Sequence, residues 1–152
     1  MKKLVFLFVS SLFILSCTND DTAETAQDPM EFEVLFQSAL TGDQLTPSPY
    51  GYVVTSLEDL YDTNNLFIQG VYQTDIFSET DFDTYYLLYV LDTYKPDSSY
   101  YIEVNSVYEN SNNVDVNITS DSTDGIAFQQ PMQPFTVVKI PKTNKPINFI
   151  FN

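Results

Sequence analysis

The chain has 152 residues and a formal net charge of −15, and it contains twelve Phe, eleven Tyr and neither His nor Arg. Neutralising the phosphates of a nucleic acid requires a basic surface, so this composition excludes DNA and RNA as partners. The lack of His removes the Ser-His-Asp and Cys-His arrangements and the most common metal ligand, so we expect no cofactor.

The first sixteen residues have the plan of a secretory signal. Lys2 and Lys3 give a basic start, and a nearly unbroken apolar run follows over residues 4–15. The run is too short to cross a bilayer, which takes about 20 apolar residues. It ends at Ser16 and Cys17, the single Cys of the chain. This pattern resembles the bacterial lipoprotein signal, in which residues 1–16 are removed and the cysteine is acylated, for example with palmitate. We therefore predict a lipid anchor at Cys17, since two acyl chains hold a protein stably on a membrane.

Residues 17–30 are predicted to form an acidic, flexible tether. Asp20, Asp21 and Glu24 follow the cysteine closely. An acidic stretch at this position resembles the export tag of Bacteroidetes-type surface lipoproteins, which implies an outer-membrane protein that faces the exterior. The alternative is that the acids only keep the tether solvated, and the side of the membrane then stays open. Removing residues 1–16 takes away two lysines and no carboxylate, so the net charge changes from −15 to −17.

Residues 31–152 are predicted to form a single β-rich domain. Acidic and apolar residues alternate over residues 31–36, which indicates a strand, and a Pro-rich loop at residues 40–49 separates it from a short strand at residues 50–55. Ser56 is the best helix N-cap in the chain, with Asp59 three residues later. The short helix that follows is expected to end near Asn64 and Asn65.

The second half of the chain contains further strands separated by turns. Residues 85–91, YYLLYVL, are too uniformly apolar for a strand with one wet face, so a central position in the sheet is expected. The other expected strands are residues 66–72, 100–108, 114–118, 135–140 and 147–151. Short strands at this spacing predict a mainly β fold, either an antiparallel sandwich or a partly open barrel, with one short helix.

Three segments together resemble a known family. They are YVVTSLEDLY at residues 52–61, a strand with a Lys-Pro turn into YYIEV within residues 85–107, and PFTVVKIPK within residues 130–142. This arrangement resembles the C-terminal domain of the PrcB family, whose members are accessory lipoproteins of a surface protease complex. The resemblance implies a noncatalytic role in binding a protein partner.

Two acidic clusters are candidates for calcium. Asp75, Glu79, Asp81 and Asp83 form the first, and the second lies at residues 121–125. Calcium takes six to eight oxygen ligands, and neither cluster has the spacing of a recognised calcium loop. Solvated acids are expected in so acidic a chain, so no metal site is predicted. Paired carboxylates of a glycoside hydrolase are also expected by chance here, and we do not predict an enzyme.

Tyrosines and lysines are the candidate contacts. Tyr94 and Tyr100 flank the Lys95-Pro96 turn, where exposed rings would make a platform for a sugar or a protein, although most tyrosines are expected in the core. The strand that contains Lys139 has prolines at both ends, which predict either an edge strand or a strand bounded by chain breakers, with Lys142 just beyond it. Such an edge either accepts a partner strand or is protected by its lysines.

The sequence thus favours a membrane-anchored, noncatalytic surface lipoprotein that binds an envelope protein complex, such as a protease. The alternative is a glycan-binding accessory lipoprotein that uses exposed tyrosines. Tyr94, Tyr100, Lys139 and Lys142 are the candidate ligand or partner contacts, and Cys17 is the candidate lipidation site.

Overall fold

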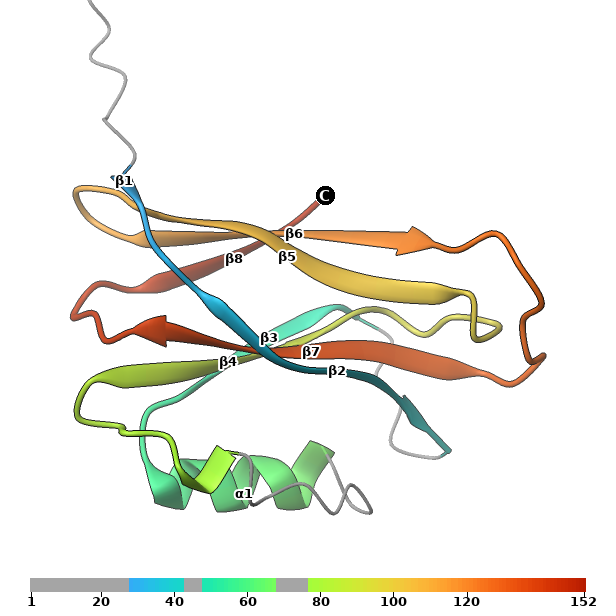
Figure 1. Cartoon of the computed structure of the whole chain (residues 1–152), viewed down its shortest axis with the longest axis horizontal. Helices are drawn as coiled ribbons and strands as arrows, with labels where there is room; N and C mark the ends of the chain where they lie inside the picture. Colours follow the sequence, from blue (N-terminus) through green and yellow to red (C-terminus); the bar gives the residue numbers. More distant parts are fainter. Residues whose placement is uncertain (1–27, 43–47, 68–76) are drawn as a thin grey trace, which may run out of the picture.

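Three layers make up the part of the chain that the computed structural model describes, residues 28–42, 48–67 and 77–152. One four-stranded sheet, sheet A, covers one face of a second sheet, sheet B, and helix α1 (Leu57–Phe67) lies against the other face of sheet B (Figure 1). The predicted fold class, mainly β in a sandwich or open barrel with one short helix, is confirmed.

The two sheets are built largely from antiparallel pairs. Sheet A has the strand order β1 (Asp28–Pro29), β5 (Tyr100–Glu109), β6 (Val114–Ser122) and β8 (Ile147–Phe151). Sheet B has the order β2 (Glu33–Thr41), β7 (Met132–Pro141), β4 (Tyr85–Leu91) and β3 (Tyr50–Val54). The β6–β8 pair is parallel, and every other pair is antiparallel.

The N-terminal strand of the domain crosses from one sheet to the other. Asp28 and Pro29 pair with the end of β5 in sheet A, although the sequence places both in the tether. After three residues the chain joins sheet B as β2, which pairs with β7 over eight residues and contains an irregularity between Val34 and Phe36. Figure 1 shows this segment running diagonally over the sandwich. Because it touches both sheets, it joins their edges.

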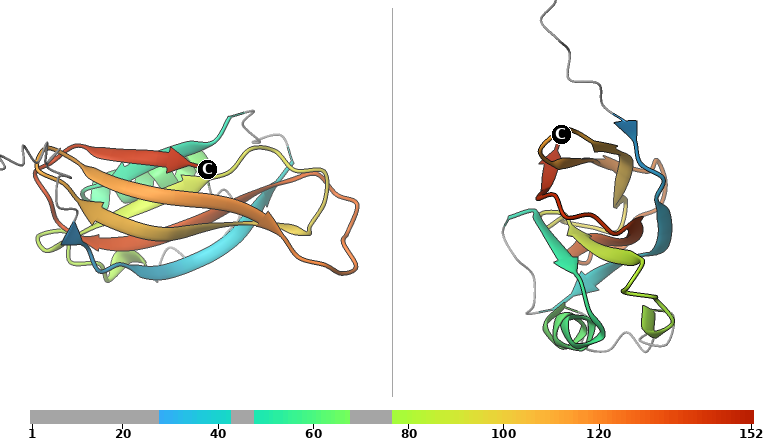
Figure 2. Two further views of the ribbon diagram at one scale, coloured as in Figure 1. Left: turned by 90° about the horizontal axis from the view of Figure 1, so that it is seen from above. Right: turned by 90° about the vertical axis from the view of Figure 1, so that its left-hand side faces the viewer.

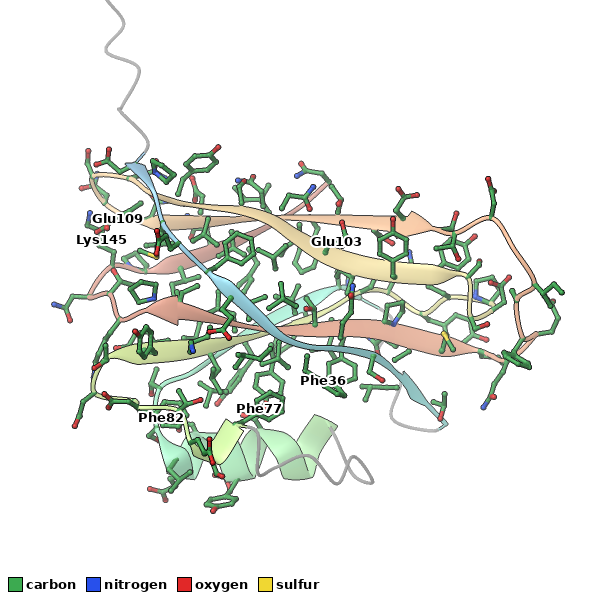
Figure 3. All side chains as sticks on the ribbon, viewed as in Figure 1. Phe36, Phe77, Phe82, Glu103, Glu109 and Lys145 are labelled. Carbon is green, nitrogen blue, oxygen red and sulfur yellow. The ribbon has the colours of Figure 1, made fainter. Side chains whose placement is uncertain are left out.

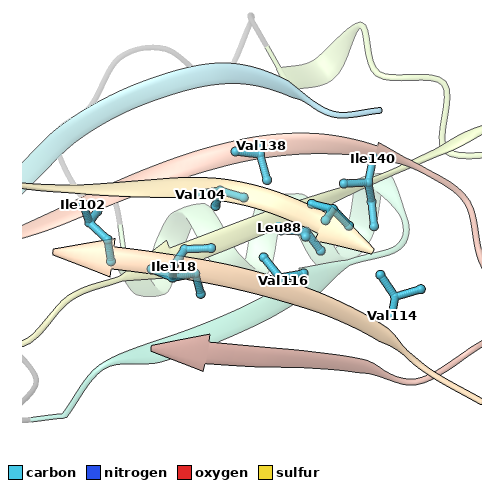
Figure 4. Packing of buried hydrophobic residues seen from close by; sticks show 10 residues of the cluster. Leu88, Ile102, Val104, Val114, Val116, Ile118, Val138 and Ile140 are labelled. Carbon is cyan, nitrogen blue, oxygen red and sulfur yellow. The ribbon is translucent and has the colours of Figure 1, made fainter. Parts of the chain in front are cut away.

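A core of aliphatic side chains lies between the sheets (Figure 4). Strand alternation explains it, since residues at every second position of a strand face the same side. The fully or nearly fully buried residues of this core are Leu88, Val90, Ile102, Val104, Val107, Val114, Val116, Ile118, Val138 and Ile140. Burying each such side chain stabilises the fold by about 1.5–3 kcal/mol.

A second, more aromatic core lies between sheet B and α1. Phe36, Phe77 and Phe82 are seen there in Figure 3, on the side of sheet B that faces the helix. The Phe36 and Phe77 rings meet edge to face with centroids 6.1 Å apart, and Phe77 meets Tyr89 in the same way at 6.0 Å. Such pairs contribute about 0.5–1.5 kcal/mol beyond the area they bury.

Strand β4 is buried on both faces because sheet B is the middle layer. Leu87, Tyr89 and Leu91 face α1, whereas Leu88 and Val90 face sheet A. The predicted central position of this strand is therefore confirmed.

The edges of the two sheets approach each other at β3 and β8. A Cβ atom built on Gly51 of β3 would lie 2.2 Å from the Phe149 ring of β8. Only glycine leaves room for this ring, and the ring fills the side of the sandwich between the sheets. The end-on view in Figure 2 shows β3 and β8 on the same side of the molecule.

The predicted N-cap of α1 is confirmed. The Asp59 amide donates to the Ser56 hydroxyl at 3.1 Å, and the Leu60 amide donates to the Ser56 carbonyl at 3.0 Å. In return, the Asp59 carboxylate accepts bonds from the Thr55 amide at 3.2 Å and the Thr55 hydroxyl at 2.5 Å. The Thr55 hydroxyl is the main cause that lowers the pKa of Asp59 below its ordinary value of 3.8.

Two sequence predictions about strands need correction. The strand expected at residues 66–72 begins inside α1, which extends to Phe67, and residues 68–72 lie outside the described residues. The strand that contains Lys139 was expected either at a sheet edge or as a strand bounded by breakers, and the edge alternative is wrong, because β7 lies between β2 and β4.

Gln133 explains why a strand with Pro134 can lie inside a sheet. Asp92 lies just beyond the end of β4, and its amide donates to the Pro134 carbonyl at 2.9 Å. In an antiparallel pair the N–H and C=O of one residue point toward the same partner, so the Pro134 nitrogen also faces Asp92. Pro134 has no N–H to return to the Asp92 carbonyl. The Gln133 side-chain amide donates to that carbonyl instead, at 2.6 Å, and Gln133 is fully buried. Because the Pro134 nitrogen faces Asp92 and not β2, the missing N–H does not remove a backbone hydrogen bond between β7 and β2.

Among the helices of the described part, none combines the length and the apolar character needed to cross a membrane.

Candidate binding surface at the loop end

The two ends of the sandwich carry different connections. The end of β2, the start of β3 and the β4–β5 and β6–β7 connections lie at one end, called here the loop end, and β1 enters at the opposite end, called the entry end (Figure 1). The pairs Thr41↔Met132, Tyr50↔Leu91 and Lys95↔Met132 bring these segments together. Strand β5 runs from the loop end to the entry end, a length of about 30 Å at 3.3 Å per residue.

Exposed apolar side chains concentrate at the loop end. Four of the eight large hydrophobic residues that are exposed in the described part lie here: Tyr50, Tyr94, Ile126 and Phe128, called here the apolar tip. Ile126 is fully exposed and Phe128 is 77% exposed. Single exposed apolar residues are normal on a protein surface, but several of them on adjacent loops are typical of an interaction site.

Backbone hydrogen bonds hold the β6–β7 loop that carries Ile126 and Phe128. The Phe128 amide donates to the Ser98 hydroxyl at 2.8 Å, and the Ser98 amide donates to the Phe128 carbonyl at 3.2 Å. At the start of the loop, the Thr123 amide donates to the Ser99 carbonyl at 2.8 Å. The loop backbone is thus fixed on the β4–β5 connection while its apolar side chains point into solvent, which reduces the entropy lost on binding.

Asp97 fixes the β4–β5 connection in turn. Its carboxylate accepts bonds from the Ser99 amide at 2.9 Å and the Ser99 hydroxyl at 2.6 Å. The Ser99 hydroxyl is the main cause that lowers the pKa of Asp97. No residue other than Gly42 has a positive φ in the described part, so Ser98 and Ser99 form this turn without strain.

A buried polar network lies beneath the apolar tip. Asp92 is 5% exposed, and its carboxylate pairs with the Lys95 ammonium at 3.0 Å and accepts a bond from the Ser120 hydroxyl. The Thr93 amide also donates to it, at 2.6 Å. Because Ser120 belongs to sheet A and Asp92 follows β4 of sheet B, the network joins the two sheets at the loop end.

The two predicted tyrosine contacts differ in exposure. Tyr94 is 48% exposed and belongs to the apolar tip. Tyr100 is half-buried, and the Lys95 ammonium lies 5.3 Å from its ring centroid. This cation–π contact occupies one face of the Tyr100 ring. Tyr94 is therefore the more open of the two rings.

Lys139 and Lys142 lie toward the entry end, away from Tyr94 and Tyr100, and both are engaged within the domain. Lys139 pairs with Glu33 at 2.5 Å and lies 5.1 Å from the Tyr85 ring centroid. The Lys142 ammonium donates to the Phe82 carbonyl at 3.1 Å and lies above another ring, that of Tyr86. An open pocket of about 250 Å³ beside Lys139 is lined by Glu31, Phe32, Glu33, Tyr85, Lys139 and Pro141.

Acids of both clusters accept hydrogen bonds from neighbouring residues of the chain. Asp81 accepts bonds from the Asp83 amide at 3.0 Å and the Thr84 hydroxyl at 2.8 Å, and Asp121 accepts one from the Ser122 amide. Asp75 and Cys17, the predicted lipidation site, lie outside the described residues. Within the described ranges, no group of three or more acidic or Cys side chains is placed to hold a metal ion.

Sequence reasoning missed Ile126, Phe128 and Tyr50 as candidate contacts. The signal was present for the first two, because both lie between the chain breakers Gly125 and Pro131, outside any alternating pattern. Tyr50 was assigned only to a strand. Comparison of the chain with protein-family models, curated proteins and solved structures gave no match.

Proposed function

We propose that this chain is a noncatalytic accessory lipoprotein, anchored in the outer membrane through Cys17, facing the exterior and related to the PrcB family. In this role its β-rich domain binds a protein of an envelope complex, such as a protease, through the apolar tip. The observation that carries the proposal is the exposure of Ile126 and Phe128 on a loop whose backbone is fixed by Ser98.

The position of the tip supports this role. The chain enters the domain at β1, and the tip lies at the opposite end of the sandwich (Figure 2). A domain anchored through its N-terminal side would carry the tip away from the membrane, where a partner can reach it.

The alternative, glycan binding through Tyr94 and Tyr100, has less support. Sugar rings stack on open aromatic faces, and the Lys95 ammonium occupies one face of Tyr100. Ile126, the most exposed residue of the tip, offers no aromatic face.

The proposal is tested by capture from membranes with matched variants. Tagged full-length chain should recover a stoichiometric protein, and Ile126→Ser with Phe128→Ser should lose it, because central apolar contacts dominate most interfaces. Leu57→Ser with Tyr61→Ser removes two other exposed apolar residues, on α1, and should leave recovery unchanged. Equal recovery by both double variants would refute the tip as the contact.

Two further measurements address the anchor and the glycan alternative. Cys17→Ala should release the protein from membranes, and continued membrane retention would contradict the anchor. Retention of the wild type on a polysaccharide column, lost in Tyr94→Ala with Tyr100→Ala, would favour the glycan alternative over a protein partner.

A further inference from the structure

The surroundings of the apolar tip are acidic. Asp97, Asp121 and Asp124 lie on the two connections that carry Tyr94, Ile126 and Phe128, or directly beside them. Asp121 and Asp124 are exposed, and the ion pairs found in the described part include none of the three.

The lysines do not balance these acids. The four lysines of the described part are each engaged elsewhere. Lys95 pairs with buried Asp92, Lys139 pairs with Glu33, and Lys145 pairs with Glu109 at 2.8 Å. Lys142 donates to a backbone carbonyl. At the loop end, the exposed apolar side chains are therefore surrounded by carboxylates that no lysine of the described part neutralises.

Tyr101 lies within this negative charge. It is the second residue of β5, beside the loop end, and lies opposite Asp121 in the sheet register. The negative charge of Asp121 is the largest cause that raises the pKa of Tyr101, and Glu103 adds to it. An anion is disfavoured at this surface and a cation is favoured.

Building on the proposed function, we infer that the apolar tip fits a protein partner with an apolar pocket bordered by Lys or Arg. The protruding Ile126 and Phe128 side chains fill the pocket, and Asp121 and Asp124 face its basic rim. A second copy of this chain does not supply such a rim, because the chain without residues 1–16 carries a net charge of −17 and no Arg. An anionic lipid surface is likewise repelled.

The inference is tested by selecting, from a library of displayed dodecapeptides, those that bind the mature lipidated chain in nanodiscs. Enriched peptides should combine an aromatic or aliphatic residue with Lys or Arg and carry net positive charge. Ile126→Ser with Phe128→Ser should weaken their binding at least about tenfold. Raising NaCl from about 50 to about 300 mM should also weaken it, because salt screens charge pairs at the rim.

Matched charge variants isolate the acidic rim. Asp121→Asn with Asp124→Asn should weaken binding about threefold and reduce its salt dependence. Glu58→Gln with Asp62→Asn makes the same charge change on the exposed surface of α1 and should have no effect.

The outcomes separate this inference from the proposed function. One outcome is that the selected peptides require Ile126 and Phe128 for binding and yet are acidic or uncharged, with binding insensitive to salt. That result would overturn the inference of a basic partner and leave the tip as the contact. A selection without any tip-dependent peptide would contradict both. Tip-dependent binding to vesicles of anionic phosphatidylglycerol, or tip-dependent dimerisation in sedimentation velocity, would replace the basic protein with a lipid or with a second copy.

Discussion

The entry end and the loop end of the sandwich handle charge in opposite ways. At the entry end, Lys145 pairs with Glu109 and donates to the Asn110 carbonyl at 2.6 Å (Figure 3). Glu109 lies opposite Asp28 in the register of β1 and β5, and like charges at such positions repel each other. The Lys145 ammonium offsets this repulsion, and both side chains of the pair are partly exposed.

Among the described residues of the loop end, Lys95 is largely buried with its acid, and the exposed charged groups are negative. Lys95 and Asp92 have side chains that are 17% and 6% exposed. The same pairing of Lys with an acid thus serves two purposes. At the entry end, the partly exposed Lys145–Glu109 pair neutralises surface charge. At the loop end, the largely buried Lys95–Asp92 pair fixes the loops that carry the apolar tip.

The largest predicted effect comes from breaking the buried pair. Asp92→Ala leaves the Lys95 ammonium buried without its carboxylate and should lower the free energy of unfolding by about 3–5 kcal/mol. Glu109→Ala breaks the exposed pair at the entry end and should cost no more than about 1 kcal/mol. Urea unfolding of both variants measures the difference.

Replacing both partners sharpens this test. Asp92→Ala with Lys95→Met removes the buried charge together with its partner and should recover part of the lost stability. Similar costs for Asp92→Ala and Glu109→Ala would mean that the two ends do not differ as described.

The second prediction compares two glycines. Gly51→Val would force a side chain into the Phe149 ring and should destabilise the fold by about 1–3 kcal/mol. A Cβ at Gly125, in the β6–β7 loop, meets nothing within 4 Å, so Gly125→Ala should change stability by no more than about 0.5 kcal/mol. Thermal unfolding that finds Gly51→Val as tolerant as Gly125→Ala would show that β3 and β8 are not closely packed.

The smallest effect concerns the cap of α1 and depends on pH. Because the folded-state pKa of Asp59 lies below 3.8, this group adds stability above that value and loses it as the pH falls through the folded pKa. Asp59→Asn should therefore be less stable than the wild type near neutral pH, and the difference should close in acid. Urea midpoints measured across a pH series test this.

Thr55→Val provides the companion measurement, because it removes the hydroxyl that is the main cause of the shift. It should reproduce part of the loss seen in Asp59→Asn. If the difference in stability between the wild type and Asp59→Asn stays constant down to acid pH, the charge of Asp59 does not stabilise the cap.

The sequence by itself determined the features that depend on neighbouring residues. Ser56 and Asp59 stand three apart, and the cap forms as that spacing predicts. The unbroken apolar run of residues 85–91 required burial on both faces, which placed β4 inside a sheet. Alternation over residues 114–118 likewise placed Val114, Val116 and Ile118 in one core.

Only the tertiary structure decided the features that join distant segments. Prolines at residues 134 and 141 left an edge strand and a strand bounded by breakers as alternatives. Only the structure places β7 inside the sheet, where the Gln133 side chain donates to the Asp92 carbonyl that Pro134 has no N–H to reach. Lys95 is near Tyr94 and Tyr100 in the sequence, yet its burial against Asp92 depends on Ser120 of the other sheet. The exposure of Ile126 and Phe128 also required the fold, because composition favours burying such residues and only the packing of the two sheets leaves their loop outside the core.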